Sequence, residues 1–189
     1  MKKVLFSFFA FILITVSCVA QGHLTFKGIP IEGTMDGFCE KLEAKGFERG
    51  ATKDNVTAFS GDFTGRQATV WVAATSDGQE VFSVVAFFES MEEWKQLVGT
   101  YNYYKNLYTR KYGEPQKVME DESSLSSGDY NVTQLWSGEL VWKSIWVTSG
   151  GDIELKIDKT DEVLKCAVFI SYRDYQNIEK KMQEDLKDI

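Results

Sequence analysis

Histidine is almost absent from this chain of 189 residues, in which His23 is the only one. A zinc site built from several histidines is therefore excluded. A Ser-His-Asp triad would have to use His23, and its place near the predicted mature N-terminus makes that role unfavourable. The sequence also lacks the Gly-x-Ser-x-Gly nucleophile elbow, the phosphate-binding loop and the Gly-x-Gly-x-x-Gly fingerprint of dinucleotide sites. Residues 120–129 are acidic and serine-rich but lack the Asp-x-Asp-x-Asp-Gly ladder of a calcium loop, so we expect a solvated loop there. We accordingly expect no cofactor and no bound metal.

Basic residues are scarcer than acidic ones, with 21 Lys and Arg against 28 Asp and Glu and a formal net charge of −7. The acidic side chains are spread along the chain and leave no basic stripe. Proteins that bind nucleic acids need such a stripe, as does electrostatic binding to anionic lipid. We therefore expect no nucleic-acid partner, and contact with a membrane only through a covalent lipid.

Long apolar runs are missing except at the N-terminus. Two lysines at positions 2 and 3 precede an apolar run over residues 4–16, which ends in the small residues of Ser17-Cys-Val-Ala20. This pattern predicts a secretory signal peptide over residues 1–20, because the run is too short to span a bilayer. Cleavage before Gln21 would release a periplasmic or extracellular protein. Alternatively, Cys18 could be the lipid-modified first residue of an outer-membrane lipoprotein.

Cysteine is sparse in the remaining chain, which keeps Cys39 and Cys166. In an oxidising compartment the two could pair, and a disulfide closing so long a loop adds about 4–5 kcal/mol in the chain-entropy model. They could equally be two buried free thiols, because unpaired cysteine is often found in cores.

Two well-patterned segments indicate the fold. Residues 80–88 and 162–170 alternate with period two, and one face of each is apolar throughout, as in strands that cover a core. Their residue-by-residue match suggests a duplicated unit. Between them, a helix beginning near Ser90 and stopped by Gly113 has apolar and aromatic residues at three- and four-residue steps, namely Trp94, Leu97, Val98, Tyr101, Tyr104 and Tyr108.

The predicted order is a helix at 35–45, strands at 56–64, 67–74 and 80–88, the long helix, four more strands and a C-terminal helix. The four later strands are expected around Trp136-Ser-Gly138, 145–148, 153–157 and 162–170. We predict one α+β domain over residues 21–189, made of two related helix-plus-antiparallel-meander units with three and four strands. The units cover about 34–88 and 90–171, and the helices are expected on one sheet face.

The opposite sheet face supplies the candidate site. If Val70 and Val72 face the core, Trp71 points away from it, and the same alternation directs Phe87 and Phe169 outward. By analogy, Ile145 and Val147 would face the core and Trp146 would point away. Clustered exposed aromatics mark partner surfaces. Trp71, Trp146, Phe87 and Phe169 are therefore the candidate contact residues, unless another segment covers this face and makes them core.

Three segments resemble a group of small secreted bacterial proteins of unassigned function. They are Gly28-Ile-Pro-Ile-Glu-Gly-Thr34, the stretch from Leu42 to Phe47, and Lys111-Tyr-Gly-Glu-Pro115. The resemblance implies no activity and no functional residues. The helix-plus-meander duplication is also similar in outline to β-lactamase-inhibitor-like folds and to small lipoproteins of outer-membrane assembly, and fold likeness alone does not establish function.

The sequence favours a non-catalytic secreted or envelope protein that binds a protein or glycan through the sheet face opposite the helices. One alternative is a hydrolase of an envelope or extracellular polymer, which would need two carboxyl groups about 5–10 Å apart in a cleft. A lipid-anchored structural protein of the envelope is the other.

Overall fold

The computed structural model describes residues 22–189 except 123, 124, 126, 127 and 129. The predicted signal peptide over 1–20, its cleavage before Gln21 and the candidate lipidation at Cys18 lie outside the described residues. No helix in the described part is both long enough and apolar enough to cross a membrane.

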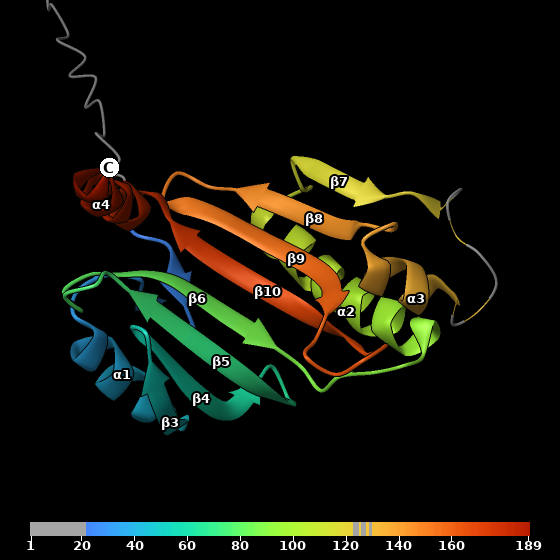
Figure 1. Ribbon diagram of the computed structural model, residues 1–189, viewed down its shortest axis with the longest axis horizontal. Helices are drawn as coiled ribbons and strands as arrows, with labels where there is room; N and C mark the ends of the chain where they lie inside the picture. Colours follow the sequence, from blue (N-terminus) through green and yellow to red (C-terminus); the bar gives the residue numbers. More distant parts are fainter. Residues whose placement is uncertain (1–21, 123–124, 126–127, 129) are drawn as a thin grey trace, which may run out of the picture.

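An eight-stranded antiparallel sheet forms the centre of the molecule, in the order β3-β4-β5-β6-β10-β9-β8-β7 (Figure 1). Its strands are β3 (Glu48–Lys53), β4 (Val56–Phe63), β5 (Arg66–Ala74), β6 (Val81–Phe87), β7 (Lys117–Glu120), β8 (Trp142–Val147), β9 (Gly151–Lys159) and β10 (Cys166–Asp174). The N-terminal β1 (Thr25–Phe26) and β2 (Ile29–Pro30) form a separate small hairpin. The mixed α and β content and the large antiparallel sheet agree with the prediction.

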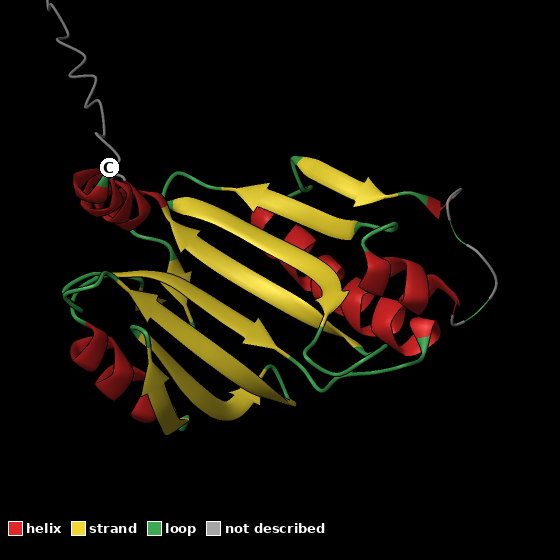
Figure 2. Ribbon diagram, in the orientation of Figure 1, coloured by secondary structure: helices red, strands yellow, loops and turns green. Residues whose placement is uncertain are grey.

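Helices α1 (Met35–Glu43), α2 (Trp94–Tyr112) and α3 (Tyr130–Ser137) lie behind the sheet in the view of Figure 2. Most of the predicted inward residues of the long helix are buried, and Val98 is partly buried; the buried ones are Trp94, Leu97, Tyr101, Tyr104 and Tyr108. They pack against buried side chains of the inner sheet face, such as Val168 and Ile170. At about 25 cal/mol per Å² of apolar surface removed from water, this layer is the main source of stability.

Tight turns join the first strands. Lys53 pairs with Val56 across one turn, and Phe63 pairs with Arg66 across the next. The two-residue loops between them have positive φ at both positions, at 50° and 59° for Asp54-Asn55 and at 56° and 82° for Thr64-Gly65. Positive φ at both central positions is the hallmark of type I′ turns, whose twist matches that of the flanking strands.

The predicted division into three and four strands is not confirmed, because each half of the sheet contains four strands. The structure adds β3 and β7 at the two edges, and places α3 where a strand was expected at Trp136-Ser-Gly138. Every residue of β3 is exposed, and β7 has only four residues. Neither strand could show the apolar alternation that identifies a half-buried strand.

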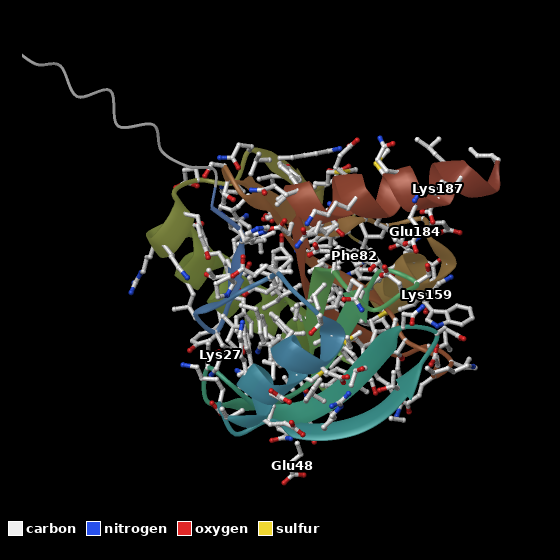
Figure 3. All side chains as sticks on the ribbon, turned by 90° about the vertical axis from the view of Figure 1, so that its left-hand side faces the viewer. Lys27, Glu48, Phe82, Lys159, Glu184 and Lys187 are labelled. Carbon is white, nitrogen blue, oxygen red and sulfur yellow. The ribbon has the colours of Figure 1, made fainter. Side chains whose placement is uncertain are left out.

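The chain ends in α4 (Tyr175–Asp185) and a short 3₁₀ helix (Leu186–Asp188). This confirms the predicted C-terminal helix. The helix crosses the end of the sheet (Figure 3), and its far end, with Glu184 and Lys187, reaches the side on which Lys159 lies, whereas Lys27 lies on the opposite side. Lys180 of α4 pairs with Glu80 at 2.6 Å, which fixes the helix to the start of β6.

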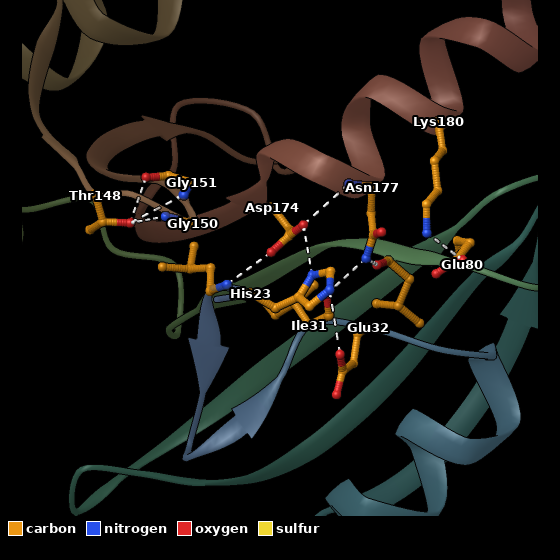
Figure 4. A network of polar contacts seen from close by, with 12 residues as sticks. His23, Ile31, Glu32, Glu80, Thr148, Gly150, Gly151, Asp174, Asn177 and Lys180 are labelled. Carbon is orange, nitrogen blue, oxygen red and sulfur yellow. Dashed lines mark hydrogen bonds and ion pairs between the residues drawn. The ribbon is translucent and has the colours of Figure 1, made fainter. Parts of the chain in front are cut away.

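The N-terminal segment is held against this end of the sheet by Asp174, the N-cap of α4 (Figure 4). The Asp174 carboxylate is fully buried and accepts hydrogen bonds from Leu24 N, Asn177 N and His23 Nδ1 at 2.8, 3.2 and 3.1 Å. The Asn177 side-chain amide donates to Ile31 O and to a backbone carbonyl of β6, each at 2.9 Å. The lone histidine therefore has a structural contact here.

Candidate functional site

The open face of the sheet brings together three of the four predicted aromatics. Phe87 of β6 pairs with Phe169 of β10. Trp71 of β5 pairs with Val85, which precedes Phe87 by two residues on the same face of β6. The Trp71 and Phe87 ring centroids lie 4.6 Å apart with planes at 64°, and the Phe87 and Phe169 centroids lie 5.3 Å apart with planes at 26°. We call Trp71, Phe87 and Phe169 the aromatic row. Its rings meet in edge-on and offset arrangements that aromatic pairs favour.

Solvent reaches this row. The Trp71 side chain is 42% exposed, and Phe87 and Phe169 are partly buried. A hollow of about 980 Å³ lies over the row. Its lining includes Gln67 at the start of β5, the link 89–91 between β6 and α2, and residues 158–162 at the end of β9 and in the loop that follows. No described segment covers the row, so the alternative in which Trp71 is core does not hold.

Trp146 does not belong to the open face, and its prediction as a contact residue is wrong. Its side chain is fully buried, and its indole Nε1 donates to Gly113 O at 2.9 Å. Its neighbours Ile145 and Val147, predicted to face the core, point outward instead, and Val147 is 48% exposed.

The reversal in β8 has a physical cause. Ser144 occupies a core position that the pattern assigned to the outer face, because its hydroxyl is satisfied there. Ser144 Oγ donates to Glu120 Oε1 at 2.8 Å and lies 2.8 Å from Tyr101 OH, whose own hydrogen goes to Glu120 Oε1 at 2.5 Å. A buried polar group costs little when it is hydrogen-bonded. One alternate set is Trp142, Ser144 and Trp146, and the other is Lys143, Ile145 and Val147. Each set has one polar residue among apolar ones, so the sequence alone could not set the direction.

Charge divides the open face into two parts. On the β8–β9–β10 side, ion pairs join Lys143 to Glu154 at 3.0 Å, Lys156 to Asp158 at 2.6 Å and Arg173 to Asp152 at 2.8 Å. On the β4–β5–β6 side, the outward positions between the strand ends carry no charge: Val56, Ala58, Ser60, Thr69, Trp71, Ala73, Ser83, Val85 and Phe87. The aromatic row thus crosses the boundary between the two parts. Trp71 and Phe87 lie on the uncharged strands, whereas Phe169 lies on β10 beside Lys156, whose Nζ is 5.9 Å from its ring centroid.

Carboxylates at the rim bear on the hydrolase alternative. Glu162 accepts hydrogen bonds from Lys165 Nζ at 2.7 Å and Ser90 Oγ at 2.5 Å, and these bonds lower the pKa of its carboxyl group. A general acid needs the opposite shift. Among residues 22–189 less the five undescribed positions, no group of three or more His, Cys, Asp or Glu side chains could hold a metal ion.

The best-connected carboxylate lies under the helices, not on the open face. Burial alone would raise the pKa of Glu120, but hydrogen bonds from Lys105, Tyr101 and Ser144 outweigh burial and hold it below 4.5. Burial and the bond to Glu120 raise the pKa of Tyr101, so its hydroxyl remains a donor. This cluster joins α2 to β7 and β8, and its contacts are those of a structural tie.

Glu120→Gln is expected to lower the free energy of unfolding at pH 7 by about 1–3 kcal/mol, because three donors lose a charged acceptor. The folded-state pKa of Glu120 lies below its ordinary value of 4.5, so its stabilising effect is full above that pH and is lost as the pH falls through the folded-state pKa. Urea unfolding at pH 7 and at about pH 3 should show the gap between parent and variant shrinking in acid. A gap that is constant with pH would contradict this account of the cluster.

The two cysteines are both free and buried, so the disulfide alternative is not realised. Cys39 lies in α1 and Cys166 begins β10 in the other half of the sheet. Burial raises the pKa of the Cys39 thiol, and it raises that of Cys166 to about 11. Thiols with such pKa values carry little thiolate at neutral pH, which makes a nucleophilic role unfavourable.

Comparison with known proteins adds no functional assignment. No family model, no curated protein and no solved structure matches the chain. The resemblance to small secreted bacterial proteins therefore stays a prediction, and the functional argument depends on the geometry of the open face.

Proposed function

We propose that this chain is an exported, non-catalytic binding protein that captures another protein on the aromatic row. The observation that carries the proposal is the position of Trp71, Phe87 and Phe169 on adjacent strands, with the uncharged outward positions of β4, β5 and β6 on one side of the row. The cores of protein–protein interfaces are depleted in charge and enriched in aromatics in the same way. An exposed tryptophan at the centre of such a surface is the residue type that most often dominates binding.

The composition of this surface favours a polypeptide over a glycan. Around the row, the outward residues of β4, β5 and β6 between the strand ends are small, aliphatic or hydroxyl-bearing. Apart from Lys156 beside Phe169, the charged groups lie on the strand ends and loops that line the hollow. A glycan presents many hydroxyls, which need amide, carboxylate or guanidinium partners when they are removed from water. A protein segment with apolar side chains makes no such demand.

The expected contribution of Trp71 agrees with this role. A tryptophan side chain offers up to about 250 Å² of surface. Burying the 42% that solvent now reaches would contribute about 2–3 kcal/mol at 25 cal/mol per Å². This value lies in the range measured for interface residues that dominate affinity. The loss of Trp71 should therefore be visible in any binding measurement.

Two further expectations accompany the proposal. Export is supported by the basic, apolar and small-residue order of residues 1–20. Duplication of one helix-plus-meander unit is supported by the central pairing of the two matched strands, in which Phe87 faces Phe169, with four strands on each side. If the two units share an origin, Phe87 and Phe169 are equivalent positions on their matched central strands. Trp71 lies on β5 of the first unit and has no equivalent in the row from the second unit.

Photocrosslinking tests the proposal at matched positions. Val85 and Ile145 are both partly buried and point outward, and they lie in one row of residues that crosses the strands. Val85 pairs with Trp71, whereas Ile145 pairs with Glu154, on the side of the face that carries the ion pairs. A photoreactive phenylalanine analogue at Val85, in cells that produce the protein, should give a protein adduct of discrete mass, and the same analogue at Ile145 should give little. No adduct at Val85, or equal adducts at both positions, would contradict the proposal. An adduct that survives proteinase digestion would show a glycan instead.

A further inference from the structure

A second cavity lies on the helix side of the sheet, away from the aromatic row. It has a volume of about 310 Å³, which is at the lower end of the range for small-molecule sites. The turn between β1 and β2, the turn between β4 and β5, helix α2 and strand β10 all contribute to its wall. Aromatic and aliphatic side chains dominate that wall: Phe63, Tyr104, Leu107, Tyr108, Tyr112 and Tyr172.

Two lysines border this cavity, and neither has a carboxylate within 4.0 Å among the described residues. Lys27 Nζ lies 5.8 Å from the Phe47 ring centroid and 6.0 Å from that of Phe63. Lys111 Nζ lies 4.9 Å from the Tyr112 centroid. Both lysine side chains are exposed. Lys27 Nζ donates one hydrogen bond, to Asp62 O at 3.3 Å, and keeps further hydrogens for an anion at the mouth.

Backbone geometry fixes the position of Lys27. Lys27 and Gly28 form the two-residue turn between β1 and β2, with φ of 51° and 79°. The first of these positions favours Asn, Asp or Gly, and a lysine there carries a conformational cost of about 1 kcal/mol. Such strain at a cavity wall is compatible with a binding role, since the turn holds an ammonium group over the aromatic rings.

Inside the cavity, one hydroxyl hydrogen has no acceptor. Tyr104 OH is satisfied, because it accepts from Thr64 at 2.9 Å and donates to Phe63 O at 3.2 Å. Tyr108 OH and Tyr172 OH are hydrogen-bonded to each other, and within the described chain neither has another partner. A hydroxyl pair has two hydrogens and uses one, so the second remains available. Tyr108 is 8% and Tyr172 4% exposed, and both line the cavity.

We propose that this cavity binds a small carboxylic acid with an aromatic or short aliphatic body, held as its anion. The apolar body lies between the tyrosine and phenylalanine rings, one carboxylate oxygen accepts the spare hydrogen of the Tyr108–Tyr172 pair, and Lys27 and Lys111 neutralise the charge at the mouth. Burial raises the pKa of Tyr108 and of Tyr172, so both hydroxyls keep their protons at neutral pH. Charge-assisted hydrogen bonds of this kind are stronger than neutral ones.

Isothermal titration of the purified protein with phenylacetate, hexanoate and the neutral phenylacetamide tests this site. At least one of the two acids should bind saturably, and phenylacetate should bind at least about tenfold more tightly than its amide. The double variant Lys27→Met/Lys111→Met should weaken acid binding by about tenfold, whereas Lys95→Met, an exposed lysine of α2 away from the cavity, should not. The lysine variants alter exposed side chains and should leave folding unchanged.

A second pair of variants checks the cavity interior. Tyr108→Phe/Tyr172→Phe removes the spare donor and keeps both rings, so it should also weaken acid binding. Trp71→Ser should not, because the aromatic row is on the other face of the sheet. The proposal is overturned if neither acid binds saturably, if the amide binds as tightly as the acid, or if the double lysine variant binds like the parent. None of these results bears on the aromatic row.

Discussion

Replacing Trp146 with alanine is expected to lower the free energy of unfolding by about 3–5 kcal/mol. The side chain is fully buried and packs against Tyr108 with ring centroids 5.5 Å apart, so its removal leaves a large cavity. The variant also leaves Gly113 O without its indole donor. Urea denaturation monitored by circular dichroism gives the difference directly.

Trp71→Ala provides the matched control, since it makes the same change in a partly exposed side chain of the neighbouring half. We expect it to cost about 1 kcal/mol or less. Equal costs for the two variants, or a larger cost for Trp71→Ala, would mean that the assignment of these residues to opposite faces is wrong.

Asp174→Ala is expected to have the second-largest effect, about 3–5 kcal/mol, because it leaves buried donors without an acceptor. Leu24 N, Asn177 N and His23 Nδ1 all point at this carboxylate (Figure 4). The variant also removes the N-cap of α4. The N-terminal segment and α4 should therefore loosen together, with faster amide exchange at Leu24 and Asn177.

Asp36→Ala is the control for this carboxylate. Asp36 pairs with Arg49 at 2.9 Å, but 81% of its side chain is exposed. Exposed ion pairs contribute about 1 kcal/mol or less, so this variant should be close to the parent in stability. If Asp174→Ala were as mild as Asp36→Ala, the N-terminal segment would not depend on the buried carboxylate.

The sequence predicted the parts of the fold that have a strong period. The central strands, the long helix and the outward direction of Trp71, Phe87 and Phe169 followed from alternation and helical spacing. The bounds of one central strand were wrong, because β10 spans Cys166–Asp174 and not 162–170, and Leu164, predicted on the core face, is 46% exposed. The edge strands did not, because Glu48–Lys53 is exposed throughout and shows no apolar face. Trp146 was assigned to the wrong face because Ser144 is satisfied inside the core by Tyr101 and Glu120, a contact between distant segments.

The tyrosine cavity was invisible in the sequence for a similar reason. Tyr108 and Tyr172 are ordinary inward residues of a helix and a strand, and Lys27 is one residue of a short turn. Only the packing of α2 against β10 and the first hairpin places them around one space. The structural role of Asp174 was likewise hidden, because its carboxylate accepts hydrogen bonds from His23 and Leu24, which are about 150 residues away in the sequence.

On the proposed function, the aromatic row binds a protein partner. The most direct test is the yield of the Val85 crosslinked adduct in Trp71→Ser compared with the parent, with the folded fraction of both checked by circular dichroism. We expect a drop of at least about tenfold, which corresponds to the loss of about 1.4 kcal/mol or more of binding free energy. An adduct of unchanged yield in a folded Trp71→Ser protein would contradict the claim.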